Sequence, residues 1–366
     1  MSRCYFFTGF PGFIASSLIR QIIRDHHAAI GHIYLLVLPD LLEKAREEVQ
    51  RVSAEEGLPF ERFSLISGDI TKPDLDILPE RNGLLQHEVT HVFHLAAVYD
   101  LAVPRQIAFN VNVNGTRNVN DWVQGLHNIE RYVYFSTAYV SGTREGRILE
   151  SELDRDQSFK NHYESTKFEA EMLVRQVMGK VPTTIIRPGI VKGNSQTGET
   201  IKFDGPYFIL NVFDKVRFLP LIPYLGAGEA EGNFVPVDYV LSATIYLGHA
   251  NAGIGKTYHL TDPKPYRMKD VYRFLLAEYL GKEPIGTIPL AAAKGFLSIP
   301  ALRKWLRIEK ESLDYLACMA AYDCTQAQND LRGSGIVCPD FKDTVGSMVQ
   351  FYERHKNDTN KQLRIS

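Results

Sequence analysis

Two side chains four residues apart, Tyr163 and Lys167, have the types and spacing of an acid–base pair. If the surrounding residues are helical, the two lie on one helix face, because positions i and i+4 are neighbours there. An ammonium group beside a phenol favours the phenolate and thereby lowers the pKa of the tyrosine. Such a tyrosine exchanges a proton near neutral pH. The spacing is common in helices, so its interpretation depends on the motifs around it.

Thr137 is a second candidate for chemistry, because it follows an apolar run that ends Tyr-Phe-Ser. We expect this run to be a strand of a parallel sheet, and ligands bind at the carboxyl ends of such strands. A hydroxyl at that position can hydrogen-bond a substrate oxygen. The alternative for Thr137 is a strand-end hydroxyl that bonds only to the backbone.

A glycine turn near the start of the chain has the form of a phosphate-binding loop, reading Thr-Gly-Phe-Pro-Gly-Phe-Ile-Ala over residues 8–15. Gly9 permits a tight turn, and Gly12 lets the backbone approach a pyrophosphate at a helix N-terminus. Pro11 removes one N–H donor, which departs from the commonest pattern. The residues assigned to this cofactor site are Thr8, Gly9, Phe10, Pro11, Gly12, Phe13 and Ile14.

Short apolar runs alternate with helical patterns over the first 200 residues, and these elements must position the candidate side chains. The runs contain few polar residues, which is typical of strands buried on both faces of a parallel sheet. Their alternation with helices predicts a doubly wound α/β fold, a Rossmann parallel sheet with right-handed crossovers. The predicted strands are residues 4–8, 33–38, 63–67, 90–96, 131–136 and 183–187.

After about residue 192 the pattern changes, and we predict a smaller, mostly helical substrate domain there. Residues 193–207 read as a long loop whose last turn, 203–207, is a candidate for lining the substrate cleft. A helix is expected over 208–218, and 257–260 reads as a strand that returns to the sheet. The predicted dinucleotide-binding domain comprises residues 1–200 with 233–265, and the substrate domain comprises 201–232 with 266–360.

Residues 291–307 combine many apolar side chains with several basic ones. Pro300 is expected to divide this stretch into two short helices. Three interpretations stay open for this stretch. It packs on the core with a solvated basic face, covers an acyl tunnel, or makes peripheral contact with a membrane surface.

Composition excludes several classes of protein. The 366 residues include 41 Lys and Arg, 43 Asp and Glu and 45% hydrophobic residues, which is ordinary globular composition. A net charge of −2 offers nucleic acid no electrostatic footprint. The four cysteines lack the spacing of a metal site, and neither a signal peptide nor a long apolar span is visible. We therefore expect a cytoplasmic protein with reduced thiols, no metal and no transmembrane helix; the oligomeric state is open.

The motifs of this chain and their order along it resemble those of the extended short-chain dehydrogenase/reductase superfamily. The resemblance extends over roughly two thirds of the chain. The resemblance implies that Tyr163 is the catalytic acid–base group, that Lys167 assists it and reaches the cofactor ribose, and that Thr137 fills a role more often taken by serine. The motifs are the glycine turn, Gly68-Asp69-Ile70, His94-Leu95-Ala96-Ala97, Asn112-Val113-Asn114-Gly115-Thr116, Ser136-Thr137, Tyr163 with Lys167, Arg187-Pro188-Gly189 and Val235-Pro236-Val237-Asp238-Tyr239.

The same resemblance implies further cofactor contacts. Asp69 and Ile70 would flank the adenine, and Ala96 and Ala97 would lie near the phosphates. Pro188 and Ile190 would contact the nicotinamide side, and Asn112 belongs to the same implied cofactor set.

The loop Gly193-Asn194-Ser195-Gln196-Thr197-Gly198-Glu199 narrows the resemblance to one branch, the fatty acyl-CoA and carrier-protein thioester reductases with a male sterility type NAD-binding domain. This branch implies NADP(H) as cofactor. It usually has an arginine at the end of the second strand, where this chain has Leu38, followed by Asp40, Lys44 and Arg46. Because an acid there suits NAD and a base suits NADP, NAD(H) stays open.

The implied reaction is hydride transfer from NAD(P)H to a carbonyl, in the first place an acyl thioester on CoA or an acyl-carrier protein, giving an aldehyde or an alcohol. Two alternatives remain: an alcohol or ketone oxidoreductase on a sterol-like or polyketide-like substrate, and a nucleotide-sugar epimerase or dehydratase. A non-catalytic dinucleotide sensor is disfavoured, because it needs no proton donor and the set of Thr137, Tyr163 and Lys167 is intact.

Overall fold

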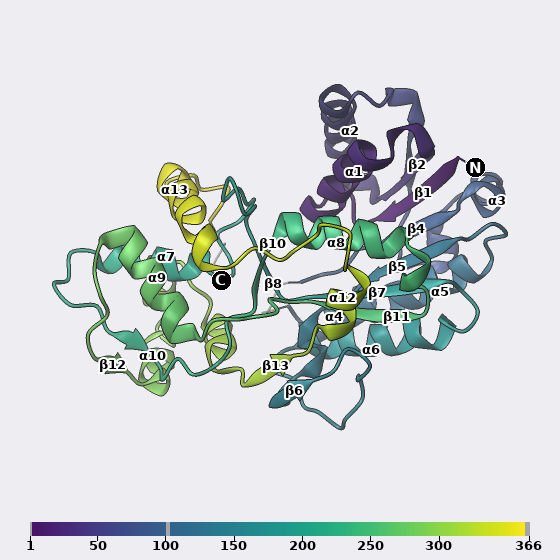
Figure 1. Ribbon diagram of the computed structural model, residues 1–366. Helices are drawn as coiled ribbons and strands as arrows, with labels where there is room; N and C mark the ends of the chain where they lie inside the picture. The colour runs from purple at the N-terminus through teal and green to yellow at the C-terminus, as the bar shows by residue number, and fades with distance from the viewer. Residues whose placement is uncertain (1, 100–102, 363–366) are drawn as a thin grey trace.

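The computed structural model, which describes residues 2–99 and 103–362, is built around a seven-stranded parallel sheet (Figure 1). The strands lie in the order β3-β2-β1-β4-β5-β7-β11, so the chain reverses direction across the sheet between β1 and β4. Ligands of doubly wound sheets bind at such a switch point, beyond the carboxyl ends of the strands. The strands are β1 (Arg3–Thr8), β2 (Ile30–Val37), β3 (Phe63–Ser67), β4 (His91–His94), β5 (Arg131–Phe135), β7 (Thr183–Pro188) and β11 (Lys256–Leu260).

Helices cover both faces of the sheet, because successive residues of each strand point to opposite faces. Tyr5 and Phe7 of β1 belong to one hydrophobic core, while Phe6 packs on the other face against Trp122. The first face is covered by α1 (Phe13–His26), α2 (Leu42–Glu56) and α8 (Val237–His249). The second is covered by α3 (Pro79–Glu88), α5 (Gly115–Gln124) and α6 (His162–Val177). The predicted α/β fold class is confirmed.

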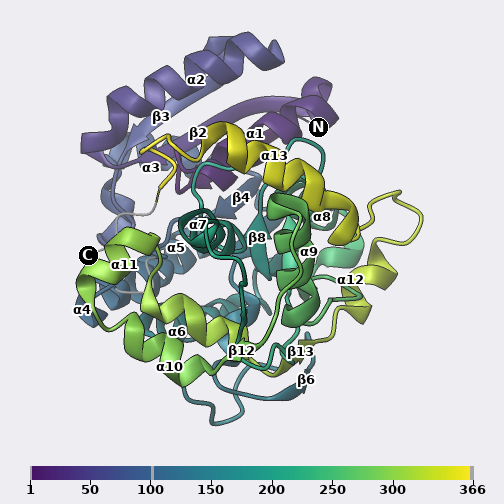
Figure 2. The same ribbon diagram turned by 90° about the vertical axis from the view of Figure 1, so that its left-hand side faces the viewer.

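A helical lobe has a hydrophobic core of its own and lies to one side of the sheet (Figure 1). Figure 2 turns this lobe toward the viewer, with α7, α9 and α13 in front of the sheet. Its elements are α7 (Tyr207–Val216), β9 (Tyr224–Leu225), α9 (Met268–Leu280), β12 (Thr287–Ile288), α10 (Leu290–Phe296), α11 (Pro300–Leu306) and α13 (Val345–His355). The division predicted from the sequence, at residues 200, 232 and 265, stays a prediction.

Two short strand pairs connect the lobe and the sheet region. β8 (Ile190–Lys192) pairs with β10 (Phe234–Pro236), and β6 (Gly146–Ile148) pairs with β13 (Ala320–Tyr322). The remaining helical pieces are α4 (Arg105–Ala108), a π-helical segment Phe109–Asn114 before α5, and α12 (Thr325–Asp330).

Most predicted elements are confirmed with small shifts at their ends. The split at Pro300 is confirmed, since α10 ends before this proline and α11 begins with it. The strand β13 was not predicted, because three residues are too few to show an alternating pattern. Within the described part of the chain, no helix combines the length and apolarity needed to cross a membrane.

Candidate active site

The glycine turn leaves the first backbone N–H groups of α1 available to an anion. Gly12 is the N-cap of α1, and no side chain caps the helix. Gly9 has φ +85°, and a Cβ on it would lie 2.8 Å from the backbone nitrogen of Ala96. A Cβ on Gly12 would lie 2.6 Å from the carbonyl oxygen of Gly9. Both glycines are therefore required by the backbone, and the uncapped N-terminus fits a dinucleotide phosphate.

Thr8 joins the glycine turn to the segment that follows β4. Its Oγ1 accepts hydrogen bonds from the backbone N–H groups of Leu95 (3.2 Å) and Ala96 (3.1 Å), and lies 2.7 Å from Nδ1 of His94. His94 also contacts Oγ1 of Thr116 at 3.1 Å, and burial lowers its pKa to about 3. The neutral imidazole thus holds the glycine turn against the segment after β4. Ala96 lies beside Gly9 in this arrangement, and Ala97, the next residue, is half-buried.

Asp69 and Ile70 follow β3 at the same edge of the sheet. The Asp69 carboxylate accepts the backbone N–H of Thr71 at 2.8 Å, which closes a local turn. Ile70 is buried, and a Cβ on Gly115 would lie 2.6 Å from its Cδ1. The structure therefore packs Ile70 under the start of α5, and its predicted adenine contact stays a prediction.

Asn112 is buried in the π-helical segment, and its side-chain amide contacts protein groups. Its Oδ1 accepts the backbone N–H of Val98 at 2.9 Å, and its Nδ2 donates to the carbonyl of Val98 and to Oγ1 of Thr166, both at 3.0 Å. The amide thus ties the segment after β4 to α6. Its predicted cofactor contact stays a prediction.

Thr137 and Tyr163 meet beyond the carboxyl end of β5. Asn161 caps α6 by accepting the backbone N–H of Glu164 at 2.9 Å, which places Tyr163 in the first turn of the helix. The Thr137 side chain lies close enough to the Tyr163 hydroxyl to lower its pKa against the larger effect of burial, and the Thr137 oxygen accepts the backbone N–H of Tyr139 at 3.3 Å. Two hydroxyls from different elements therefore meet at one point.

The prediction that Lys167 lowers the pKa of Tyr163 was wrong, because the pKa of Tyr163 is raised. Burial is the largest influence on the phenol and raises the pKa of Tyr163 to about 12. Lys167 is itself buried, which lowers its pKa to about 7, so it carries no full charge at neutral pH. Its ammonium donates to the carbonyl of Phe135 and lies 4.5 Å from the ring centre of Tyr134. At neutral pH Tyr163 is therefore a protonated phenol and a proton donor.

A buried ion pair lies behind these residues, and no pattern in the sequence indicated it. Arg187 donates to Glu171 through Nε (2.9 Å) and Nη2 (2.6 Å), and both side chains are almost fully buried. Glu171 also accepts Ser136 Oγ at 2.6 Å and Arg175 Nε at 3.0 Å. This network connects α6, β5 and β7. Arg187 was visible in the Arg-Pro-Gly motif, but no pattern indicated its partner.

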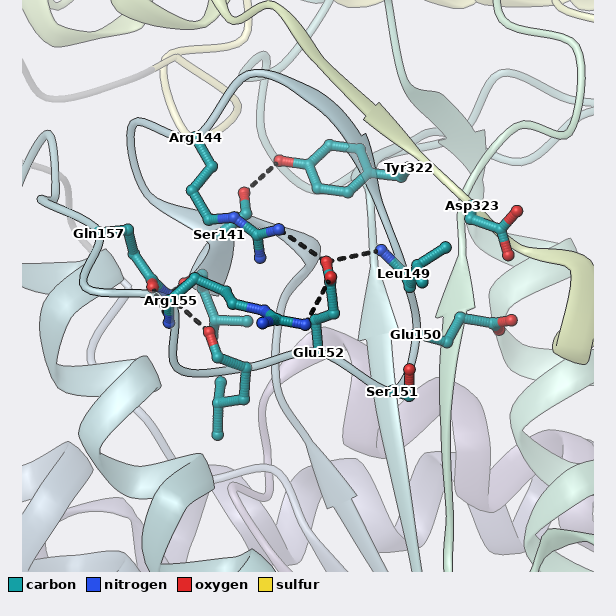
Figure 3. Close-up of polar contacts among 12 residues, drawn as sticks. Ser141, Arg144, Leu149, Glu150, Ser151, Glu152, Arg155, Gln157, Tyr322 and Asp323 are labelled. Atoms are coloured by element: carbon teal, nitrogen blue, oxygen red, sulfur yellow. Dashed lines mark hydrogen bonds and ion pairs between the residues drawn. The ribbon is translucent and has the colours of Figure 1, made fainter.

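The segment between β5 and α6 is held by two glutamates (Figure 3). The Glu152 carboxylate receives Arg144 at 2.6 Å and Arg155 at 3.0 Å, as Figure 3 shows. The Glu150 carboxylate accepts the backbone N–H groups of His259 (3.0 Å), Gln326 (2.6 Å) and Ala327 (3.1 Å). These bonds join the loop that precedes Tyr163 to the end of the sheet and to α12.

Pro188 and Ile190 lie where β7 passes into β8. Pro188 is buried, and Ile190 is half-buried and packs against both the helical lobe and the small cluster around Tyr139. In the following loop, Ser195 donates from its backbone N–H (2.8 Å) and its hydroxyl (2.6 Å) to Asp238, at the start of α8. The loop is thus a structural connection between the lobe and α8.

The residues at the expected ribose position do not distinguish NAD from NADP. Leu38 is 47% exposed, and Asp40, Lys44 and Arg46 are exposed around the start of α2. Across residues 2–99 and 103–362, no group of three or more His, Cys, Asp or Glu side chains is arranged to hold a metal ion.

Comparison with known proteins agrees with this geometry. The family model described as "Male sterility protein", an NAD-binding family, matches residues 7–244. A putative fatty acyl-CoA reductase of Drosophila melanogaster is 26% identical over 321 residues, covering 73% of this chain and 61% of the relative. A non-canonical nonribosomal peptide synthetase of Aspergillus campestris is 26% identical over 289 residues, covering 74% of this chain and 27% of the relative. The chain thus spans only part of each relative.

Among solved structures, the terminal R domain from the myxalamid PKS-NRPS biosynthetic pathway has a TM-score of 0.80 and 24% identity. The match covers 97% of this chain and 91% of that domain. At this identity the likeness establishes a shared fold, including the helical lobe.

Proposed function

The chain belongs to the male sterility family of NAD-binding domains, and we propose that it is an NAD(P)H-dependent reductase of acyl thioesters. Membership supports an oxidoreductase of the extended short-chain dehydrogenase/reductase type. The observation that carries the proposal is the hydroxyl pair of Thr137 and Tyr163, at the same sheet edge as the uncapped glycine turn. A proton donor beside a dinucleotide site is what reduction of a carbonyl requires.

The glycine turn and the segment after β4 are the proposed holders of the cofactor. Gly9 and Gly12 are the residues that the close backbone packing of this turn allows, and the N-terminus of α1 supplies donors to a pyrophosphate. When bound, a nicotinamide cofactor supplies the hydride that reduces the carbonyl carbon. We propose NADPH as the preferred form, on the resemblance to the thioester reductase branch.

Tyr163 and Thr137 would act on the carbonyl oxygen, where negative charge develops during reduction. Two hydroxyl donors aimed at one point stabilise that charge, and preorganised donors of this kind are a large contribution to catalysis. Tyr163 then delivers its proton, which its raised pKa of about 12 keeps in place until the oxygen becomes basic. On a thioester the product is a hemithioacetal, which collapses to an aldehyde and a free thiol.

The proposed substrate is an acyl group tethered to CoA or to an acyl-carrier protein. The support is the naming of the relatives, one a fatty acyl-CoA reductase and another a nonribosomal peptide synthetase. Because the overall charge is −2, recognition of CoA phosphates or of an acidic carrier would depend on a local basic surface.

The test is to incubate the full chain with acyl-CoA thioesters of several chain lengths and either NADPH or NADH. Thiol release and cofactor oxidation are followed in the same sample. We expect both signals in a one-to-one ratio if reduction ends at the aldehyde, and one thiol for two cofactors if it ends at the alcohol. Absence of both signals with every thioester would contradict the proposal.

A further inference from the structure

A second tyrosine, Tyr99, lies beside Tyr163 and has no part in the chemistry described above. The two rings meet edge to face, with centroids 6.5 Å apart and an interplanar angle of 76°. Tyr99 is 52% exposed, so its ring borders the open side of the site. In the described part of the chain, Tyr99 is thus an aromatic residue in direct contact with the ring of the proposed proton donor.

The Tyr99 hydroxyl donates a hydrogen bond to the carboxylate of Asp204, in the turn before α7. The ammonium of Lys202 lies 5.9 Å from the centre of the Tyr99 ring. Tyr99 belongs to the segment after β4, whereas Asp204 and Lys202 lead into the helical lobe. The bond therefore connects the two parts of the molecule beside Tyr163.

Both ends of this connection are anchored. On one side, Asn112 binds the N–H and the carbonyl of Val98, the residue before Tyr99, and also donates to Thr166 of α6 at 3.0 Å. Thr166 lies three residues after Tyr163, so the same amide fixes Tyr99 relative to the helix that carries the proton donor.

On the other side, Asp204 lies in a turn that is packed into the lobe. Phe203 is fully buried and donates its N–H to the carbonyl of Lys361 at 2.7 Å. Its ring is tilted against that of Tyr207 and meets that of Tyr352 edge to face. A ring held from two rigid sides cannot easily move away from a bulky substrate, because packed elements do not deform continuously.

We propose that Tyr99 is a specificity-determining residue: held by Asp204 and Asn112, its ring forms a wall that admits unbranched acyl groups to Tyr163 and excludes groups branched next to the carbonyl. This inference rests on the proposed reduction of a carbonyl at Tyr163 and adds the shape of the acyl group. Steric discrimination of this kind changes kcat/KM by about tenfold or more for a few carbon atoms.

The test compares two isomers, octanoyl-CoA and 2-propylpentanoyl-CoA, and the two corresponding aldehydes. The measured quantity is the ratio of kcat/KM for the linear isomer to that for the branched one. In Tyr99→Ala we expect this ratio to fall about tenfold. In Tyr99→Phe and Asp204→Ala, which keep the ring but lose its hydrogen bond, we expect smaller falls, of about two- to threefold. Cofactor affinity, measured by fluorescence, should stay unchanged in all three.

Tyr246→Ala is the matched control, because Tyr246 is a 38% exposed tyrosine on α8. An unchanged ratio in Tyr99→Ala, or an equal fall in Tyr246→Ala, would overturn the inference. Tyr99→Leu serves as a second variant without the ring if the alanine variant folds poorly. A wild-type chain that reduces aldehydes but no thioester contradicts the proposed substrate alone, and the aldehyde ratio then still decides the role of Tyr99. A chain that reduces neither overturns both.

Discussion

The carboxyl edge of the sheet and the buried network around Glu171 use polar groups in opposite ways. At the edge, the N-terminus of α1 has no side-chain cap, and the Tyr163 hydroxyl lies in a pair with Thr137. About two turns further along α6, the Glu171 carboxylate accepts four hydrogen bonds, from Arg187, Arg175 and Ser136.

The difference separates groups that act from groups that hold them in place. Donors at the edge keep capacity for a ligand, at the expense of stability, while the buried network is saturated and fixes α6 against β5 and β7. Since α6 carries both Tyr163 and Glu171, one helix serves both purposes. Substitutions in the two regions should therefore affect activity and folding separately.

The largest difference between the effect on activity and the effect on stability is expected for Tyr163→Phe, which removes one hydroxyl at the carboxyl edge of the sheet. Loss of a general acid reduces kcat/KM by about 10³-fold. The cofactor affinity and the free energy of unfolding should change little, because the ring is kept. Steady-state kinetics, a cofactor titration and urea unfolding measure the three quantities. A variant with normal turnover would contradict the assignment of Tyr163.

Glu171→Gln should show the reverse pattern. Arg187 would keep its charge in a buried site, with no carboxylate to balance it, and breaking such a pair costs about 3–5 kcal/mol. The control is Glu55→Gln, because Glu55 is paired with Arg20 at 3.1 Å but its side chain is 51% exposed. There we expect a loss of about 1 kcal/mol or less. Equal losses in urea unfolding would show that burial of the Glu171 pair contributes nothing.

The edge was readable from the sequence, because its parts are local. Gly9 and Gly12 lie three residues apart, and Tyr163 and Lys167 lie four apart, so their proximity follows from short-range geometry. The α/β fold follows equally from short apolar runs, and the strand over residues 63–67 was predicted with its observed bounds.

The buried network was not readable, because its members are brought together only by the sheet. Glu171 and Arg187 are 16 residues apart, and Glu150 and Gln326 are 176 apart. The pKa of Tyr163 was mispredicted for a related reason: spacing indicates which groups are neighbours, but burial, which decides both pKa shifts here, depends on the whole fold.

Glu150 offers a pH-dependent test at the margin of the buried network. Burial raises its pKa from 4.5 to about 7 in the folded protein. The folded state therefore binds more protons than the unfolded state between these values, and the contribution of Glu150 to stability falls as pH rises from about 4.5 to about 7. The loss is about 3 kcal/mol.

Glu150→Gln removes this titration while keeping a side chain of the same shape. We expect urea unfolding of the variant to vary less with pH than that of the wild type, with the difference confined to that window. Parallel profiles for the two proteins would contradict the raised pKa.

Gly9→Ala gives the smallest expected effect and compares two glycines with nearly the same backbone. Gly9 and Gly57 have φ +85° and +73°, so an alanine is strained at either position, by about 1–2 kcal/mol. At Gly57 a Cβ meets nothing within 4 Å, whereas at Gly9 it lies 2.8 Å from the backbone of Ala96. The shared strain should lower the stability of both variants by about 1 kcal/mol, and Gly9→Ala should lose more than Gly57→Ala because its Cβ also displaces the backbone of Ala96. Only Gly9→Ala should weaken cofactor binding, by about tenfold. Equal cofactor affinities in the two variants would mean that the turn does not hold the cofactor, since the shared backbone strain is already matched.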